Sequence, residues 1–309
     1  MTATPRAESV LSTTEWRVRA VAHRERVQPW TLPHRERHAR REAHPVYDFL
    51  FQYYAYSAGR LEAWHPAPYE ALEDTPLARE RFCGPAYRAD GGVIRRDMRA
   101  LPPATRERMG NVVRVLTATR GRPANFACFG LHEWAMVFRG HDVRHAGIAP
   151  LRLTQNQVDE LVMSRPVVCS HYDAFRFFAP DAKPLNRVQL TRVSRDESEQ
   201  PGCIHANMDL YRWAQSSMPW IGSDLLWHCF ELAAALRTLD MQASPYDFSA
   251  LGFEPVRVET PEGRELYQQR QRDLSARASV LRDRLIEVVG AHLTVAMTYE
   301  AQDVAPYEA

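Results

Sequence analysis

The strongest constraint on the fold is an aromatic segment from His44 to Pro66, HPVYDFLFQYYAYSAGRLEAWHP. Its aromatic face comprises Tyr47, Phe49, Phe51, Tyr53, Tyr54 and Tyr56. Aromatic side chains bury large apolar areas, so a segment this rich in them belongs in a core. Pro45 suits the first turn of a helix. We therefore expect one deeply buried helix over this segment.

Helical periodicity and capping residues recur along the chain. The expected helices are Thr13–Val27, Thr31–Ala43, Thr105–Ala118, Thr154–Ser164, Ala206–Gln215, Ser223–Met241 and Gly263–Leu285. Pro29 and Pro33 separate the first two. The proline- and glycine-rich residues 67–103 predict a long irregular connection with short helical pieces. Extended segments are expected only at 167–170 and 255–259. The predicted fold class is mainly α, a single compact helical domain with long irregular connections and few short strands.

The length of 309 residues suits one large core, and we divide the chain into three parts. Residues 1–43 form a basic, arginine-rich helical segment, 44–289 the helical core domain, and 290–309 a loosely held tail. The basic run Arg17–Arg41 could contact phosphates or form a solvated helical face, which is the commoner outcome. The formal net charge of +1 argues against a strongly electrostatic nucleic-acid binder.

Motifs for several enzyme classes are missing from the sequence. It contains neither GxGxxG nor GxxxxGK[ST], so we expect no NAD, FAD or ATP site. It contains no GxSxG, and His132-Glu133 is followed by Trp-Ala-Met, which excludes the HExxH metalloprotease motif. Lys183 is the only lysine, so Schiff-base chemistry would depend on it or on the N-terminus.

The cysteines bear on cofactors and on compartment. Their spacing gives no CxxC pair for a zinc ribbon or an iron–sulfur cluster, and it fits reduced thiols at Cys83, Cys128, Cys169, Cys203 and Cys229. The sequence has no signal-peptide pattern and no apolar run long enough to cross a bilayer. We therefore predict a cytoplasmic protein without a membrane partner.

Three short stretches concentrate the unusual chemistry: 125–145, 167–178 and 200–213. Each combines a histidine, a nearby carboxylate and aromatic residues. The pairs are His132 with Glu133, His171 with Asp173, and His205 with Asp209. A spacing of four residues on a helix puts His205 and Asp209 on one face. Imidazole is a common metal ligand and carboxylates ligate or orient it, so a shared histidine-ligated metal or haem site is predicted. The alternative is that the histidines are structural core residues.

The chain also resembles a known family. The segments HPVYDFLFQYYAY, WHP, CFGLHEWAMVF, CSHYDAFRFF, EQPGCIHANMDLYRWA and DMQASPYDFSALGFEPVRVET resemble those of a bacterial family, common in high-GC genomes, labelled 3-methyladenine DNA glycosylase. The similarity covers about 44–285. It implies release of alkylated bases, DNA as partner, and Asp173 or Asp209 as the catalytic carboxylate.

A looser architectural similarity is to haem-dependent aromatic oxygenases of the tryptophan dioxygenase type. It implies that 46–64 forms the distal wall and that His205 ligates the haem iron, with Asp209 accepting from its other ring nitrogen. In a non-haem variant, His132, His171 and His205 surround iron or zinc with one carboxylate. The spacing of the histidines along the sequence does not distinguish the haem site from the non-haem site.

The favoured prediction is an iron oxygenase or oxidoreductase that acts on a small aromatic or amino-acid-like substrate. Its expected catalytic residues are His132, Glu133, His171 and Asp173, and its metal ligands are His205 and Asp209. The expected substrate-binding residues are Arg139, Arg144 and Arg176 for a carboxylate, and Trp134, Phe175 and Tyr211 for an aromatic ring. The alternatives are the glycosylase and a non-catalytic helical binding protein, and a homodimer is possible in each case.

Overall fold

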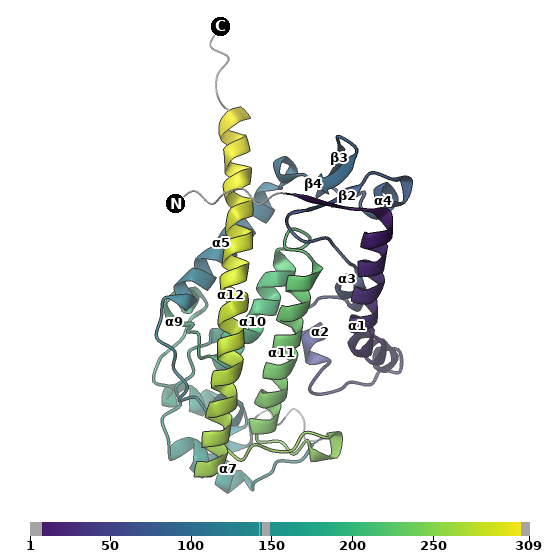
Figure 1. Ribbon diagram of the computed structural model, residues 1–309. Helices are drawn as coiled ribbons and strands as arrows, with labels where there is room; N and C mark the ends of the chain where they lie inside the picture. Colours follow the sequence, from purple (N-terminus) through teal and green to yellow (C-terminus); the bar gives the residue numbers. More distant parts are fainter. Residues whose placement is uncertain (1–7, 142, 144–148, 304–309) are drawn as a thin grey trace.

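The computed structural model describes residues 8–141, 143 and 149–303, and within them the chain is mainly α-helical, as predicted (Figure 1). The longer helices are α1 (Thr13–Ala39), α5 (Pro103–Arg120), α7 (Gln155–Met163), α10 (Ile204–Ser216), α11 (Ser223–Ala243) and α12 (Pro261–Asp303). The shorter ones are α2 (Phe49–Gln52), α3 (Ala58–Glu62), α4 (Pro76–Arg81), α6 (Leu131–Met136), α8 (Tyr172–Phe175) and α9 (Arg195–Ser198). The 3₁₀ segments are η1 (Met98–Ala100), η2 (Phe138–Gly140), η3 (Pro180–Leu185), η4 (Arg192–Ser194) and η5 (Ser249–Leu251).

The core is organised around α11. Its sequence, SDLLWHCFELAAALRTLDMQA, is apolar on nearly all sides, and most of its side chains are buried. Helices α10 and α12 pack against it, and α5 packs on the other side of α12, which runs along the length of the molecule (Figure 1). No described helix has the length and apolar character that spanning a membrane requires.

Helix α1 corrects the prediction of two N-terminal helices. It continues through Pro29 and Pro33, although each proline removes a backbone hydrogen bond. Packing compensates: Val27 and Thr31 are fully buried, and the helix lies against α3. Several arginines of the basic run are held by acids, including the pairs Arg19–Glu70, Arg26–Asp224, Arg35–Glu62 and Arg37–Asp48. Most side chains in the second half of α1 are nevertheless exposed, as the interpretation of the basic run as a solvated helical face predicts.

The aromatic segment is buried as predicted, but the expectation of one continuous helix is wrong. It forms α2 and α3, separated by a turn in which Ala55 has a left-handed φ of 50°. Leu50, Phe51 and Tyr56 are buried in the main core. The ring-to-ring packing of the aromatic side chains outweighs the helical preference of the segment, because a straight helix would spread the rings around its axis.

Residues 67–103 contain the predicted short helical pieces, α4 and η1, and also three of the four strands of a small sheet that was not predicted. The strands are β1 (Ser9–Leu11), β2 (Glu70–Glu73), β3 (Tyr87–Asp90) and β4 (Val93–Arg96), in the order β1-β2-β4-β3. β1 is parallel to β2, with Val10 opposite Ala71, and the other pairs are antiparallel, with Leu72 opposite Ile94. Gly91 and Gly92, both at positive φ, make the two-residue turn between β3 and β4. The Gly91-Gly92 dipeptide is visible in the sequence, but the strands on either side of it are too short to show a clear alternation of apolar and polar residues.

Some of the remaining predicted elements are confirmed and others are wrong. The helices expected over 105–118, 154–164, 206–215 and 223–241 are confirmed within a few residues. Residues 255–259 form no strand, while Val167 is extended and bridges to Asn186. The tail prediction is wrong for 290–303, which continue α12 and bury His292 and Ala296. Residues 304–309 lie outside the described chain.

Candidate metal centre

The three histidine-bearing stretches meet in the core. The ring centroids of His132 and His205 lie 4.6 Å apart, and those of His171 and His205 lie 5.5 Å apart. His132 comes from α6, His171 precedes α8, and His205 stands in the first turn of α10. Side chains far apart in the chain therefore form one continuous group, as the shared-site prediction requires.

The first cluster comprises His132, Glu133, His205 and Asp240. His132 Nε2 donates to Asp240 Oδ1 at 2.8 Å, and His205 Nε2 lies 3.7 Å from Asp240 Oδ2. His132 Nε2 is also 3.9 Å from Glu133 Oε1. One potential ligand atom from each of the four residues falls within 4.8 Å of the others. The Asp240 carboxylate thus lies between two imidazoles.

Local packing fixes His132 beside Asp240. Helix α6 begins after Gly130, whose φ of 73° is readily adopted by glycine. A Cβ at Gly130 would lie 3.2 Å from the Ala243 Cβ, so the start of α6 rests directly on the end of α11. Trp134 Nε1 donates to the Ala243 carbonyl at 2.9 Å and holds the same contact. His132 then faces the turn of α11 that carries Asp240.

The second cluster comprises His171, Glu199 and Asp209, all buried. His171 Nε2 lies 3.4 Å from Glu199 Oε1 and 3.4 Å from Asp209 Oδ2. His171 Nδ1 is buried and has no hydrogen-bond partner among the described residues. Because Nε2 faces both carboxylates, it is the candidate ligand atom of this cluster.

Arginines compensate part of the buried negative charge. Arg237 Nη1 is 3.4 Å from Asp240 Oδ2, Arg195 Nε is 2.9 Å from Glu199 Oε1, and Arg212 Nε is 3.5 Å from Asp209 Oδ1. The two clusters hold four carboxylates, Glu133, Asp240, Glu199 and Asp209, against these three guanidinium groups. A proton on His132, or a metal ion in its place, would supply the fourth positive charge.

Titration properties follow from burial and from these charges. Burial opposes the charged form of His132, but the Asp240 carboxylate outweighs it and raises the pKa of His132 well above its usual range. Burial lowers the pKa of His205 to about 3, although Asp240 acts in the opposite direction. Burial also acts to raise the pKa of Asp209, but Arg212 and His171 lower it to about 2. For Glu199, burial prevails and raises the pKa. The environment thus supplies a neutral imidazole at His205 and a carboxylate at Asp209, the states in which these groups bind metals.

A cavity of about 480 Å³ gives access to the first cluster. Glu133, His205 and Arg237 reach its lining. Most of the other lining side chains are apolar or aromatic, among them Pro45, Phe49, Met136, Val137, Phe177 and Tyr246. The cavity is therefore suited to a small molecule with an apolar body.

The cysteines near the site belong to neither cluster of potential ligands. Cys128 Sγ lies 3.3 Å from His132 Nδ1. Burial raises the pKa values of Cys169 and Cys203, in the second case to about 12. Protonated thiols are poor metal ligands, which agrees with their interpretation as small buried side chains.

Two predicted pairings need correction. Asp209 contacts His171, and the partner of His205 is Asp240, so the expected His205–Asp209 pair is wrong. Asp173 was grouped with His171, but its carboxylate is held by Arg176, Arg195 and Arg212. It therefore belongs to neither cluster of potential ligands.

Three predicted aromatic substrate contacts are core residues. Trp134 and Tyr211 are fully buried, and Phe175 packs on Phe178. None of them lines the cavity over the first cluster. Trp134 and Tyr211 each follow a site residue by two positions on a helix, which turns them to a different face.

The three arginines predicted to bind a substrate carboxylate have different outcomes. Arg139 pairs with Asp181 on an exposed part of the surface and lines neither of these two cavities, so its assignment to substrate stays a prediction. Arg144 lies outside the described residues. Arg176 lines a second cavity, described below.

Asp240 and Glu199 were not predicted from the sequence as site residues. Asp240 was detectable as an acid inside an otherwise apolar helix, three residues after Arg237. Glu199 ends the polar run RDESE, which is typical of an exposed segment and gave no indication of burial.

Comparisons with protein-family models, with curated proteins and with solved structures found no match to this chain.

Proposed function

We propose that this protein is a non-haem metalloenzyme with two adjacent metal sites, loaded with iron, that oxidises a small organic substrate. The observation that carries the proposal is the convergence of three histidines and four carboxylates into two touching clusters. Four carboxylates are expensive to bury in a core, and a metal ion that takes the place of the His132 proton would bring them additional positive charge.

The donor set is compatible with iron. It contains imidazole and carboxylate but no deprotonated thiol, which suits iron, manganese or zinc and disfavours metals that prefer sulfur. Paired carboxylates and histidines inside a helical bundle are also how di-iron carboxylate proteins bind their metals. This comparison is an analogy of site architecture, because folds of this kind host several functions.

The tight packing supports a non-haem centre over a haem on His205. His205 Nε2 faces Asp240 Oδ2 at 3.7 Å, and the His132 ring lies beside it. A haem needs a broad flat slot in front of its axial nitrogen, and here that space holds a carboxylate and a second imidazole. Iron held directly by the side chains requires no such slot.

The roles of the residues follow from their positions. In the first cluster His132, His205 and Asp240 would hold one metal ion, with Glu133 between the ion and the cavity. In the second, His171, Glu199 and Asp209 would hold another. Bound iron would supply electron transfer to dioxygen, which accepts the electrons that the substrate loses. Arg237 reaches both Asp240 and the cavity, so it would fix the carboxylate and orient a polar substrate group.

The test is the metal content of the purified protein, measured by elemental analysis, together with its ultraviolet–visible and Mössbauer spectra. The proposal predicts up to two iron ions per chain without a Soret band, and consumption of dioxygen when substrate is present. Stoichiometric zinc or no metal after loading with ferrous iron would contradict it, and a Soret band would restore the haem interpretation.

The glycosylase function implied by the sequence resemblance has less support in the geometry. Both candidate carboxylates are engaged: Asp173 by three arginines and Asp209 by His171 and Arg212. Release of 3-methyladenine from alkylated duplex DNA by the metal-free protein would favour that function. If the protein neither binds metal nor releases the base, the remaining alternative is a non-catalytic binding protein.

A further inference from the structure

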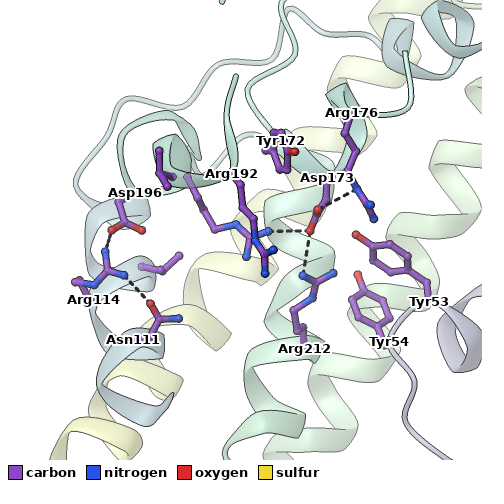
Figure 2. A pocket seen from close by; sticks show the side chains of 13 residues that line it. Tyr53, Tyr54, Asn111, Arg114, Tyr172, Asp173, Arg176, Arg192, Asp196 and Arg212 are labelled. Atoms are coloured by element: carbon purple, nitrogen blue, oxygen red, sulfur yellow. Dashed lines mark hydrogen bonds and ion pairs between the residues drawn. The ribbon is translucent and has the colours of Figure 1, made fainter. Parts of the chain in front are cut away.

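A second cavity, of about 860 Å³, adjoins the metal centre and is strongly basic. Its charged lining residues are the arginines Arg114, Arg176, Arg192, Arg195 and Arg212 and the acids Asp173 and Asp196. Five guanidinium groups thus face two carboxylates, a formal excess of three positive charges. The arginines come from separate elements: Arg114 from α5, Arg212 from α10, Arg176 from the end of α8, and two from the 192–195 segment (Figure 2).

The two acids are already saturated. Asp173 Oδ2 accepts from Arg195 at 2.8 Å and from Arg212 at 3.1 Å, while Arg176 lies 3.2 Å from the other oxygen. Asp196 pairs with Arg114. Each carboxylate is therefore occupied, and neither remains to neutralise a further cation.

Arg192 is the cation left over. It is exposed, and among the described residues its side chain has no ion pair or hydrogen bond. Figure 2 shows it between the Arg114 and Asn111 side chains on one side and Arg212 with Asp173 on the other. The free guanidinium of Arg192, with those of Arg114 and Arg212 on its two sides, is suited to a bidentate contact with an oxyanion.

Tyrosines complete the cavity. Tyr53, Tyr54 and Tyr172 line it, and the Arg212 guanidinium lies 5.1 Å from the Tyr53 ring centroid. Burial raises the pKa of Tyr53 to about 12, so its hydroxyl stays protonated and can donate to an anion.

The two cavities share part of their walls. Tyr53 and Asp173 line both the basic cavity and the apolar cavity that reaches Glu133 and His205. A ligand held by its anionic group among the arginines would have its apolar part on the side of the metal centre.

We propose that the basic cavity binds the carboxylate or phosphate group of a small organic anion, with Arg192 as the principal contact. That this anion is the substrate rests on the proposed function; anion binding itself does not. Arg176, expected from the sequence to bind a substrate carboxylate, lies in the same cavity.

The experiment is calorimetric titration of the full chain at low salt with inorganic phosphate, phenyl phosphate and 3-phenylpropionate, and with the neutral 3-phenylpropionamide. We expect at least one anion to bind and the amide to bind at least about 10-fold more weakly, since a charge-assisted hydrogen bond contributes about 1.5–3 kcal/mol. Preference between the two phenyl compounds identifies the head group.

Arg192→Ala is the test variant and Arg187→Ala its control, because Arg187 is also exposed but lines neither cavity. We expect Arg192→Ala to weaken anion binding about 10-fold and Arg187→Ala to leave it unchanged, with equal melting temperatures and metal contents in both. The inference is overturned if no anion binds, if the amide binds equally well, or if Arg192→Ala binds the anion as tightly as the parent does.

Metal analysis of the same samples separates the two proposals. Anion binding by a protein that takes up no metal would overturn the proposed function and leave the anion site standing. Metal uptake without anion binding would overturn the anion site alone.

Discussion

Asp240 lies between His132 and His205, with one carboxylate oxygen 2.8 Å from the first imidazole and the other 3.7 Å from the second. In this arrangement both oxygens face ring nitrogens, and the aspartate is fully buried. A carboxylate placed in this way can accept hydrogen bonds from the two rings or, with them, bind a metal ion.

Asp240→Asn is therefore expected to remove metal from the first cluster. The amide keeps the shape but loses the charge, so metal affinity should fall by more than about 100-fold, given that outer-shell partners alone contribute 10–100-fold. Elemental analysis after loading with ferrous iron measures the loss. Asp224→Asn is the matched control, because Asp224 stands on the same helix with an exposed side chain. Full metal content in folded Asp240→Asn would contradict the assignment; if this variant misfolds, Glu133→Gln tests the same cluster from the cavity side.

His171→Ala should empty the second cluster while leaving the first loaded. His171 is its only imidazole, so the metal content is expected to fall from two ions per chain to one. His228→Ala is the control, because His228 is exposed on α11 and belongs to neither cluster. Loss of both ions in a variant with an unchanged circular dichroism spectrum would show that the two sites bind metal as one unit. Retention of both would remove His171 from the ligands.

Much of the helical fold was predictable because it depends on local periodicity and caps. The Thr154 capping box and the apolar pattern of α11 are examples in which short-range sequence decides the structure. Helix α1 differs, because its continuation through Pro29 and Pro33 depends on tertiary contacts made by Val27 and Thr31.

The site was predictable in its histidines but not in its pairings. Histidine next to carboxylate is visible in the sequence, whereas the contacts of His205 depend on α11, and those of His171 on the segment before α10. The spacing of His205 and Asp209 was right for a helix, yet each side chain met a closer partner on another element. Long-range contacts of this kind are set by helix packing, which no local pattern encodes.

The variant Trp134→Phe tests whether Trp134 is a core residue or a substrate contact. The substitution removes the Nε1 hydrogen bond to the Ala243 carbonyl and leaves that buried acceptor without its donor. We expect the free energy of unfolding to fall by about 1–3 kcal/mol, measured by urea denaturation. Metal content and affinity for 3-phenylpropionate should be unchanged in the folded protein. A variant of unaltered stability with weaker ligand binding would return Trp134 to the substrate site.

Asp48 should make the stability of the protein depend on acid pH. Its side chain is 2% exposed and accepts hydrogen bonds from Arg37, His34 and the His44 backbone N–H. Burial acts to raise the pKa of Asp48, but these donors outweigh it and lower the pKa from 3.8 to about 2. Because the folded-state pKa lies below the unfolded value, the contribution is complete above about pH 4 and is lost as the pH falls towards 2.

Asp48→Asn is the variant that measures this contribution. We expect it to be less stable than the parent by about 2 kcal/mol at pH 7, with the difference shrinking as the pH falls from 4 to 2. Glu42→Gln serves as control, since its exposed pair with Arg40 contributes little. Urea denaturation of the three proteins across this range is the measurement. A parent–variant difference that stays constant down to pH 2 would mean that Asp48 stabilises the fold by packing and not through its charge.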